Sequence, residues 1–188
     1  MINDYACDKL GGHRAPVVAI DSKDPNTVAS ASEDCTARLW DLRTLKAYKS
    51  FISATPIPSI VFDKQDEHQV HVILHSSELH SFDLRKPDVL DRVGLRKLEL
   101  DIPPDCEINS MSMHYKDKVI AIADDDKITI VDLVLNCQKS FRRLHSNVIS
   151  KVMFKPKSKL ASSCGFDYLF RTWDYRSGKL KVTKDHKS

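Results

Sequence analysis

The residues best suited to chemistry lie in one short segment, which contains four histidines and two glutamates: His68, His71, His75, His80, Glu67 and Glu78. Zinc would need three or four such ligands converging tetrahedrally. His75 and His80 are an odd number of positions apart, so on a strand their side chains point to opposite faces. His71 and His75 share a face, but no third ligand accompanies them. The segment therefore does not predict a metal site.

Other motifs of catalysis or cofactor binding are missing from the sequence. The acidic run 124–126 lacks the ligand spacing of an EF-hand and is typical of a β-turn. The sequence contains no G-x-S-x-G, P-loop or G-x-G-x-x-G motif. We therefore expect no cofactor and no enzymatic activity.

A motif of a large apolar residue followed by aspartate recurs four times and organises the chain. It occurs as Trp40-Asp41-Leu42-Arg43, Phe82-Asp83-Leu84-Arg85, Val131-Asp132-Leu133 and Trp173-Asp174-Tyr175-Arg176. The aspartates are 42, 49 and 42 residues apart. A frame of apolar residues recurs upstream of each motif. The chain thus divides into repeats over approximately residues 10–49, 50–96, 97–141 and 142–184.

Short strands are the elements that must position these motifs. Segments 36–40 and 127–131 are rich in β-branched or aromatic residues and are bounded by turn-forming residues. Helical periodicity is nowhere sustained over ten residues. Evenly spaced short strands without helices predict an all-β fold.

The repeats resemble the WD-repeat family of β-propellers. Gly12-His13 is followed 27 residues later by Trp40-Asp41, and Leu144-His145 is followed 28 residues later by Trp173-Asp174. A repeat of about 42 residues that folds into one four-stranded blade is the pattern of that family. The resemblance covers residues from about 10 to 180. It implies four propeller blades and a non-enzymatic protein-interaction scaffold.

The length accounts for only part of the ring that this resemblance implies. The family favours seven blades, which need about 300 residues, whereas the 188 residues hold four repeats. The chain could be a fragment, a four-bladed ring or half of a dimeric ring, and the connection lengths favour a partial seven-bladed propeller. An open array leaves a strand edge unpaired, so we expect poor behaviour as an isolated monomer.

The resemblance also gives the repeat histidines and tryptophans a structural role. In the family, a loop His, a strand Ser or Thr, a turn Asp and a strand Trp form a hydrogen-bonded row in each blade. A buried Trp N–H needs a partner, and a neutral His can relay between a hydroxyl and a carboxylate. The first repeat offers the set His13, Ser32, Asp34 and Trp40. The fourth offers His145, Asp167 and Trp173, with Gly165 at the hydroxyl position.

The second and third repeats do not supply this row. At the corresponding positions, the second repeat has Ser53, Ser76 and Phe82, and the third has Pro104, Asp125 and Val131. We therefore expect these two blades to rely on apolar packing alone and to be less rigid.

Partner binding is expected at the arginine two positions after the repeat aspartate, where the third repeat has Val134 instead. These W-D-x-R boxes resemble the docking boxes of substrate receptors for cullin-4 ubiquitin ligases, in which the Arg contacts an adaptor of the damaged-DNA-binding-protein type. The resemblance implies a set of partner-binding residues: Arg43, Arg85, Arg176, Asp41, Asp83 and Asp174. Alternatively, each Arg pairs with acids of its own blade, in a general scaffold of chromatin or signalling complexes.

Composition bears on the partners and the compartment. The net charge of +3 is too balanced to indicate a nucleic-acid or membrane partner. Residues 139–188 carry 13 Lys and Arg against 3 Asp and Glu, for which a solvated surface is favoured over a nucleic-acid face. The five cysteines are scattered, and charges interrupt the first 25 residues. We expect reduced thiols, no signal peptide, and location in the cytoplasm or nucleus.

Overall fold

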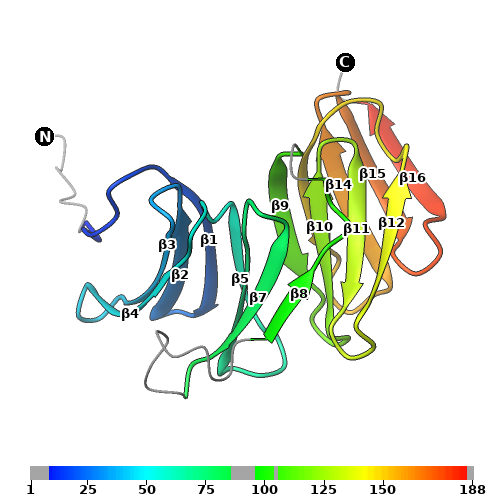
Figure 1. The fold of residues 1–188 in the computed structure, drawn as a ribbon. Coiled ribbons are helices and arrows are strands. Elements are labelled where there is room, and N and C mark those ends of the chain that lie inside the picture. The colour runs from blue at the N-terminus through cyan, green and yellow to red at the C-terminus, as the bar shows by residue number, and fades with distance from the viewer. Residues whose placement is uncertain (1–8, 86–95, 104–105, 186–188) are drawn as a thin grey trace, which may run out of the picture.

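A computed structural model describes residues 9–85, 96–103 and 106–185 of the chain. Within these ranges it contains sixteen β-strands, arranged as four antiparallel sheets of four strands (Figure 1). In each sheet, neighbouring strands are consecutive in the sequence. The all-β, blade-like fold predicted from the repeats is thereby confirmed. No described residue belongs to a helix that could cross a bilayer.

The sheets are called blades one to four in chain order. Blade one comprises β1 (Val17–Asp24), β2 (Thr27–Ser32), β3 (Thr36–Asp41) and β4 (Lys46–Ile52). Blade two comprises β5 (Ser59–Phe62), β6 (Gln69–Ile73), β7 (Glu78–Asp83) and β8 (Arg96–Glu99). Blade three comprises β9 (Ile108–Met113), β10 (Val119–Asp124), β11 (Lys127–Asp132) and β12 (Cys137–Arg142). Blade four comprises β13 (Ile149–Phe154), β14 (Leu160–Gly165), β15 (Leu169–Asp174) and β16 (Leu180–Asp185).

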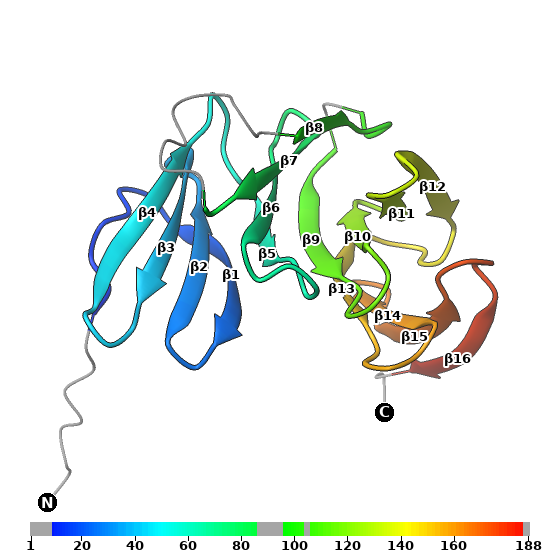
Figure 2. The same cartoon turned by 90° about the horizontal axis from the view of Figure 1, so that it is seen from below.

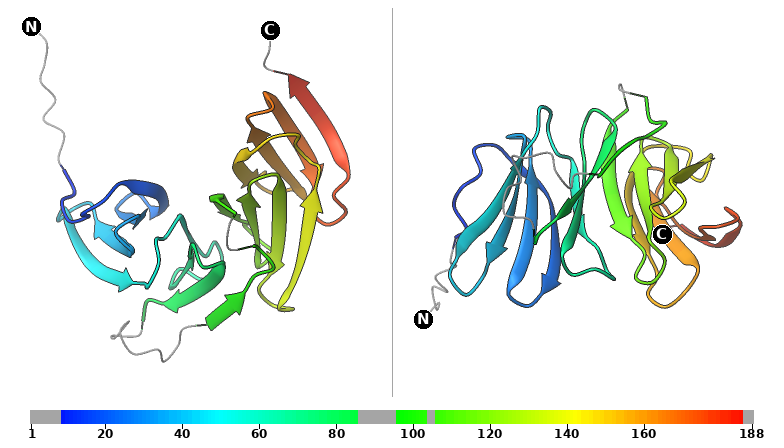
Figure 3. Two further views of the ribbon diagram at one scale, coloured as in Figure 1. Left: turned by 45° about the horizontal axis from the view of Figure 1, so that its top comes forward. Right: turned by 60° about the horizontal axis from the view of Figure 1, so that its bottom comes forward.

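The four blades follow one another in chain order as an open arc (Figure 2). Contacts between blades run through their first strands: β1 contacts β5, β5 contacts β9, and β9 contacts β13. Both views of Figure 3 place the first and last blades at opposite ends of the arc. The arc therefore has two faces, one formed by each set of interstrand turns.

Three apolar clusters hold successive blades together. The cluster between blades one and two joins small residues such as Ala29 and Ala31 to larger ones such as Ile60 and Phe62. The other two clusters join blade two to three and blade three to four in the same manner. Burial of apolar surface is the main stabilising contribution to such interfaces.

The turn between the second and third strands has the same backbone in three blades. Cys35, Ser77 and Tyr168 all adopt a φ of 62° there. In blades one and four an aspartate precedes this residue and closes the turn. Asp34 Oδ1 accepts from the backbone N–H of Thr36 at 2.9 Å, and Asp167 Oδ1 accepts from that of Leu169 at 3.1 Å. This turn fixes the carboxylates used in the site below.

Candidate functional site

The repeat aspartates shape the turn between the third and fourth strands of every blade. In all four turns, Oδ1 of the aspartate accepts a hydrogen bond from the backbone N–H two residues later. The donors are Arg43 at 2.9 Å, Arg85 at 3.0 Å, Val134 at 2.8 Å and Arg176 at 2.9 Å. Such Asx turns hold the backbone in one conformation. The aspartate therefore fixes where the side chain two positions later emerges.

Arg43 and Arg85 make the same contact in blades one and two. Nε and Nη2 of Arg43 donate to the two carboxylate oxygens of Asp41 at 3.0 and 2.9 Å. Arg85 donates in the same way to Asp83 at 2.9 and 2.8 Å. The hydrogen bonds from Arg43 lower the pKa of Asp41 below its ordinary value. Each Arg thus pairs with the aspartate of its own blade, yet the two side chains stay 71% and 58% exposed.

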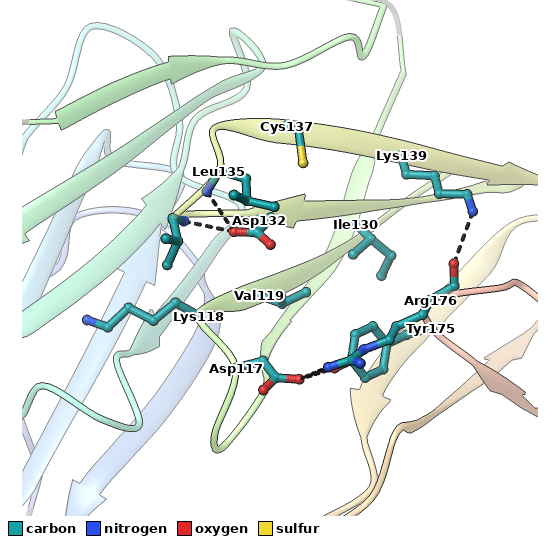
Figure 4. A pocket seen from close by; sticks show the side chains of 11 residues that line it. Asp117, Lys118, Val119, Ile130, Asp132, Leu135, Cys137, Lys139, Tyr175 and Arg176 are labelled. Carbon is teal, nitrogen blue, oxygen red and sulfur yellow. Dashed lines mark hydrogen bonds and ion pairs between the residues drawn. The ribbon is translucent and has the colours of Figure 1, made fainter.

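Arg176 makes a different contact, which joins two blades (Figure 4). Its Nη2 donates to Asp117 of the β9–β10 loop at 3.0 Å, and its Nε donates to the Tyr175 hydroxyl at 3.3 Å. The Tyr175 hydroxyl in turn donates to Asp117, which lowers the pKa of that carboxyl. Asp174 accepts backbone N–H groups of its own turn instead. Blade four therefore directs its arginine toward blade three.

A groove with a volume of about 520 Å³ lies beside Arg176, between blades three and four. Asp117, Lys118, Tyr175 and Lys139 contribute to its lining (Figure 4). Val134 also lines it, at the position that the other repeats give to arginine, and it is 70% exposed. At this one position of the turn, the side chain thus changes from arginine in blades one, two and four to valine in blade three.

Blade one contains a hydrogen-bonded row built on Ser30. His13 Nε2 lies 2.7 Å from Ser30 Oγ, and Trp40 Nε1 donates to the same oxygen at 2.8 Å. His13 Nδ1 lies 3.0 Å from Asp34 Oδ2. Since Ser30 Oγ accepts the Trp40 N–H, its own hydrogen can reach the ring nitrogen of a neutral His13.

The prediction of Ser32 as the hydroxyl of this row was wrong. Ser32 instead donates to the backbone oxygen of Ala15 at 3.2 Å. Trp40 pairs with Val28 across the sheet, so Ser30 is the next residue on the same strand face and Ser32 lies one step further away.

Blade four has the same row, for which the sequence alone did not predict a hydroxyl. His145 Nε2 lies 2.8 Å from Ser163 Oγ, and Trp173 Nε1 donates to Ser163 Oγ at 3.2 Å. His145 Nδ1 lies 2.9 Å from Asp167. Gly165 is therefore not the hydroxyl position, and the same two-residue offset that displaced Ser32 explains this correction.

Burial and hydrogen bonding have opposite effects on the pKa of the aspartate in each row. Burial raises the pKa of Asp34, but hydrogen bonds from Thr36, from the backbone N–H of Arg14 and from His13 outweigh it, so the net pKa lies well below its ordinary value. The same balance lowers the pKa of Asp167, mainly through His145. A carboxylate held ionised inside one blade stabilises that blade and does not meet an external substrate.

The comparisons with known proteins agree with this geometry. Residues 6–41 match the family model described as WD domain, G-beta repeat. The chain is 30% identical, over 181 residues, to WD repeat-containing protein 53 homolog of Dictyostelium discoideum, an alignment that covers 92% of this chain. The chain is thus similar to WD-repeat proteins in sequence and in fold. It spans about half of that curated relative, 47% of its length.

Blades two and three contain buried polar groups where only apolar packing was predicted. His71 Nε2 lies 3.3 Å from Asp63 Oδ2, and its Nδ1 lies 2.7 Å from Ser81 Oγ. Lys118 of blade three donates to Asp63 Oδ2 at 3.0 Å. The side chains of Asp63 and His71 are 0% and 1% exposed. The prediction of purely apolar blades was therefore wrong, because these polar residues occupy positions outside the repeat row.

Two other histidines of the candidate metal segment pair separately with glutamates. His80 lies 2.8 Å from Glu78, and His68 lies 3.6 Å from Glu67. In the described ranges, no three His, Cys, Asp or Glu side chains come together as metal ligands. Sequence reasoning missed Asp63 and Lys118 as a pair. The one available signal was His71, a polar residue inside the apolar strand β6.

Proposed function

We propose that this WD-repeat scaffold serves as a substrate receptor of a cullin-4-type ubiquitin ligase. It would dock on an adaptor of the damaged-DNA-binding-protein type through Arg43 and Arg85, with Arg176 as a third contact. The observation that carries the proposal is the matched geometry of Arg43 and Arg85, each held by two hydrogen bonds on an exposed turn. The substrate would occupy the opposite face of the arc.

The chemistry of the paired arginines supports an interface role. A guanidinium has five N–H donors, and the carboxylate pair uses two of them. The others can donate to carbonyls or carboxylates of a partner. Because the aspartate already orients the arginine side chain, docking would cost little additional side-chain conformational entropy. Arginine is also enriched among interface hot spots.

The three arginines would not contribute equally. Among the described residues, the side chains of Arg43 and Arg85 donate hydrogen bonds to the aspartates of their own turns, whereas Arg176 donates to Asp117 of blade three. The backbone oxygen of Arg176 accepts from Lys139 at 3.0 Å, which ties this turn further to blade three. Arg43 and Arg85 are therefore the better test of docking, since their removal leaves the contacts between blades in place.

The test is recovery of the adaptor with the purified chain. The Arg43→Ala/Arg85→Ala double variant should lose most of the adaptor that the unchanged chain recovers, because both anchors are removed. Arg14→Ala is the matched control, since Arg14 is an exposed arginine next to the turn on the opposite face. Circular dichroism would establish that all three proteins are folded.

A second candidate is a general scaffold of chromatin or signalling complexes without a ligase role. The ion pairs that Arg43 and Arg85 form within their own turns favour it, since such pairs need no partner. Equal adaptor recovery by the double variant, or no recovery by any of the proteins, would overturn adaptor docking and favour this alternative.

A further inference from the structure

A second cavity, with a volume of about 570 Å³, opens on the face opposite the Asp-Arg turns. Residues of blades one, two and three line it, including Glu33 of the β2–β3 turn and Glu107 just before β9. Val18 of β1 and Ile108 of β9 provide apolar wall. The cavity therefore lies where the first strands of three blades begin.

The polar lining of this cavity includes two acids. These are Glu33 and Glu107; His75 and Asn109 are the other polar residues, and no Lys or Arg is among the described residues that line it. Within the described part of the chain, neither carboxylate forms an ion pair. The groove beside Arg176, on the other face, is lined by three cations, Lys118, Lys139 and Arg176, and by two carboxylates, Asp117 and Asp132. Of these two hollows, only the one lined by Glu33 and Glu107 has acids and no Lys or Arg among its described lining residues.

The wall of the cavity is stiff and has an unused hydrogen-bonding group. Pro56 and Pro58 flank Ile57, and a proline ring fixes its own backbone φ angle. Ile57 is 1% exposed, so this stretch is anchored in the core. Asn109 also lines the cavity, with its Nδ2 buried and without a hydrogen-bond partner among the described residues.

We propose that this cavity binds an arginine or lysine side chain from a peptide segment of a partner protein. The apolar walls would cover the methylene stem of the side chain, and Glu33 and Glu107 would attract its cationic end. Such recognition is independent of adaptor docking, because the arginines of the Asp-Arg turns lie on the other face. In a ligase receptor, it would define basic segments as the substrate class.

The test is a titration of the ¹⁵N-labelled full chain, followed by NMR, with a capped Gly-Ala-Arg-Ala-Gly peptide. We expect shifts of the Asn109 side-chain amide and of the Glu33 and Glu107 backbone amides. The same peptide with lysine in place of arginine should cause the same shifts. The peptide with glutamine at that position should bind at least about tenfold more weakly than the arginine peptide, because it lacks the positive charge. Raising the salt concentration should weaken binding of the cationic peptides.

The Glu33→Gln/Glu107→Gln double variant should also bind the arginine peptide about tenfold or more weakly. Asp126→Asn is the matched control, because Asp126 is exposed in the β10–β11 turn on the same face and does not line the cavity. The spectrum of each variant reports directly whether it is folded. Equal binding of the arginine and glutamine peptides, unchanged binding by the double variant, or no shifts at millimolar peptide would overturn the proposal.

Discussion

Buried polar side chains have different hydrogen-bond partners in blades one and four than in blades two and three. In blades one and four, the His, Ser, Asp and Trp side chains satisfy one another inside a single blade. Blade two instead buries Asp63, whose carboxylate accepts from Lys118 of blade three. Loss of the repeat row has therefore not produced a purely apolar blade. The polar contacts of blade two lie partly inside the blade, through His71, and partly across the boundary to blade three, through Lys118.

The electrostatics of Asp63 show why the relocated contact is stable. Burial raises the pKa of Asp63, but hydrogen bonds from His71, from the backbone N–H groups of Asp66 and Gln65, and from Lys118 lower it well below its ordinary value. Neither carboxylate oxygen of Asp124 in blade three has a hydrogen-bond partner among the described residues. Burial and the charge of Asp125 raise its pKa, and Lys127, 3.4 Å away, offsets this only in part. A buried carboxylate needs several donors to remain ionised.

The largest expected effect comes from neutralising Asp63. Asp63→Asn should lower the free energy of unfolding by about 3 kcal/mol, because it removes a fully buried carboxylate that contacts both His71 and Lys118. Urea denaturation followed by fluorescence would measure this loss. Glu67→Gln, in the same loop but at a side chain that is 70% exposed, should have little effect.

The pH dependence of that loss identifies its source. Because the pKa of Asp63 is lowered on folding, its ionised form contributes stability above its unfolded pKa, and this contribution is lost as the pH falls toward its folded pKa. The difference in free energy of unfolding between the unchanged chain and Asp63→Asn should therefore become smaller as the pH falls from about 5 to about 2. A difference that stays constant over this range would show that the Asp63 charge is not responsible.

An intermediate effect is expected in the row of blade one. Ser30→Ala should lower the free energy of unfolding by about 2 kcal/mol, because His13 and Trp40 both lose their shared hydrogen-bond partner at a buried site. Ser32→Ala should cost about 1 kcal/mol or less, because it removes only contacts to the backbone. Thermal or urea unfolding of the two variants measures the difference. Equal losses would contradict the assignment of Ser30 to the row.

The smallest effect is expected at the contact between blades three and four. Tyr175→Phe removes the hydroxyl that donates to Asp117 but leaves the Arg176 bond to the same carboxylate, so we expect a loss of about 1 kcal/mol. Tyr115→Phe is the matched control, because Tyr115 is 39% exposed. If both variants lose the same stability, the Tyr175 hydroxyl is not a specific link between blades.

The blades themselves were predictable from the sequence because strand patterns and turn residues are local signals. The recurrence of Trp or Phe before Asp located the third strand of blades one, two and four in the correct order. The row was misassigned by two residues because Ser30 and Ser32 lie on the same strand face, and only the pairing of Trp40 with Val28 distinguishes them. The Asp63–Lys118 pair was inaccessible, since it joins residues 55 positions apart in different blades.

The order of contacts between the first strands has a mechanical consequence. Since β1 contacts β5, β5 contacts β9, and β9 contacts β13, a pulling force applied at the two ends of the arc would load the boundaries between blades in series. The boundary between blades two and three has the Lys118–Asp63 ion pair as an additional link, and the boundary between blades three and four has Arg176–Asp117. The boundary between blades one and two has Lys64–Asp21 and Lys23–Glu67. Asp63 is fully buried, whereas the acid of every other pair is at least 23% exposed, so the Lys118–Asp63 link should be the last of these ion pairs to break under tension.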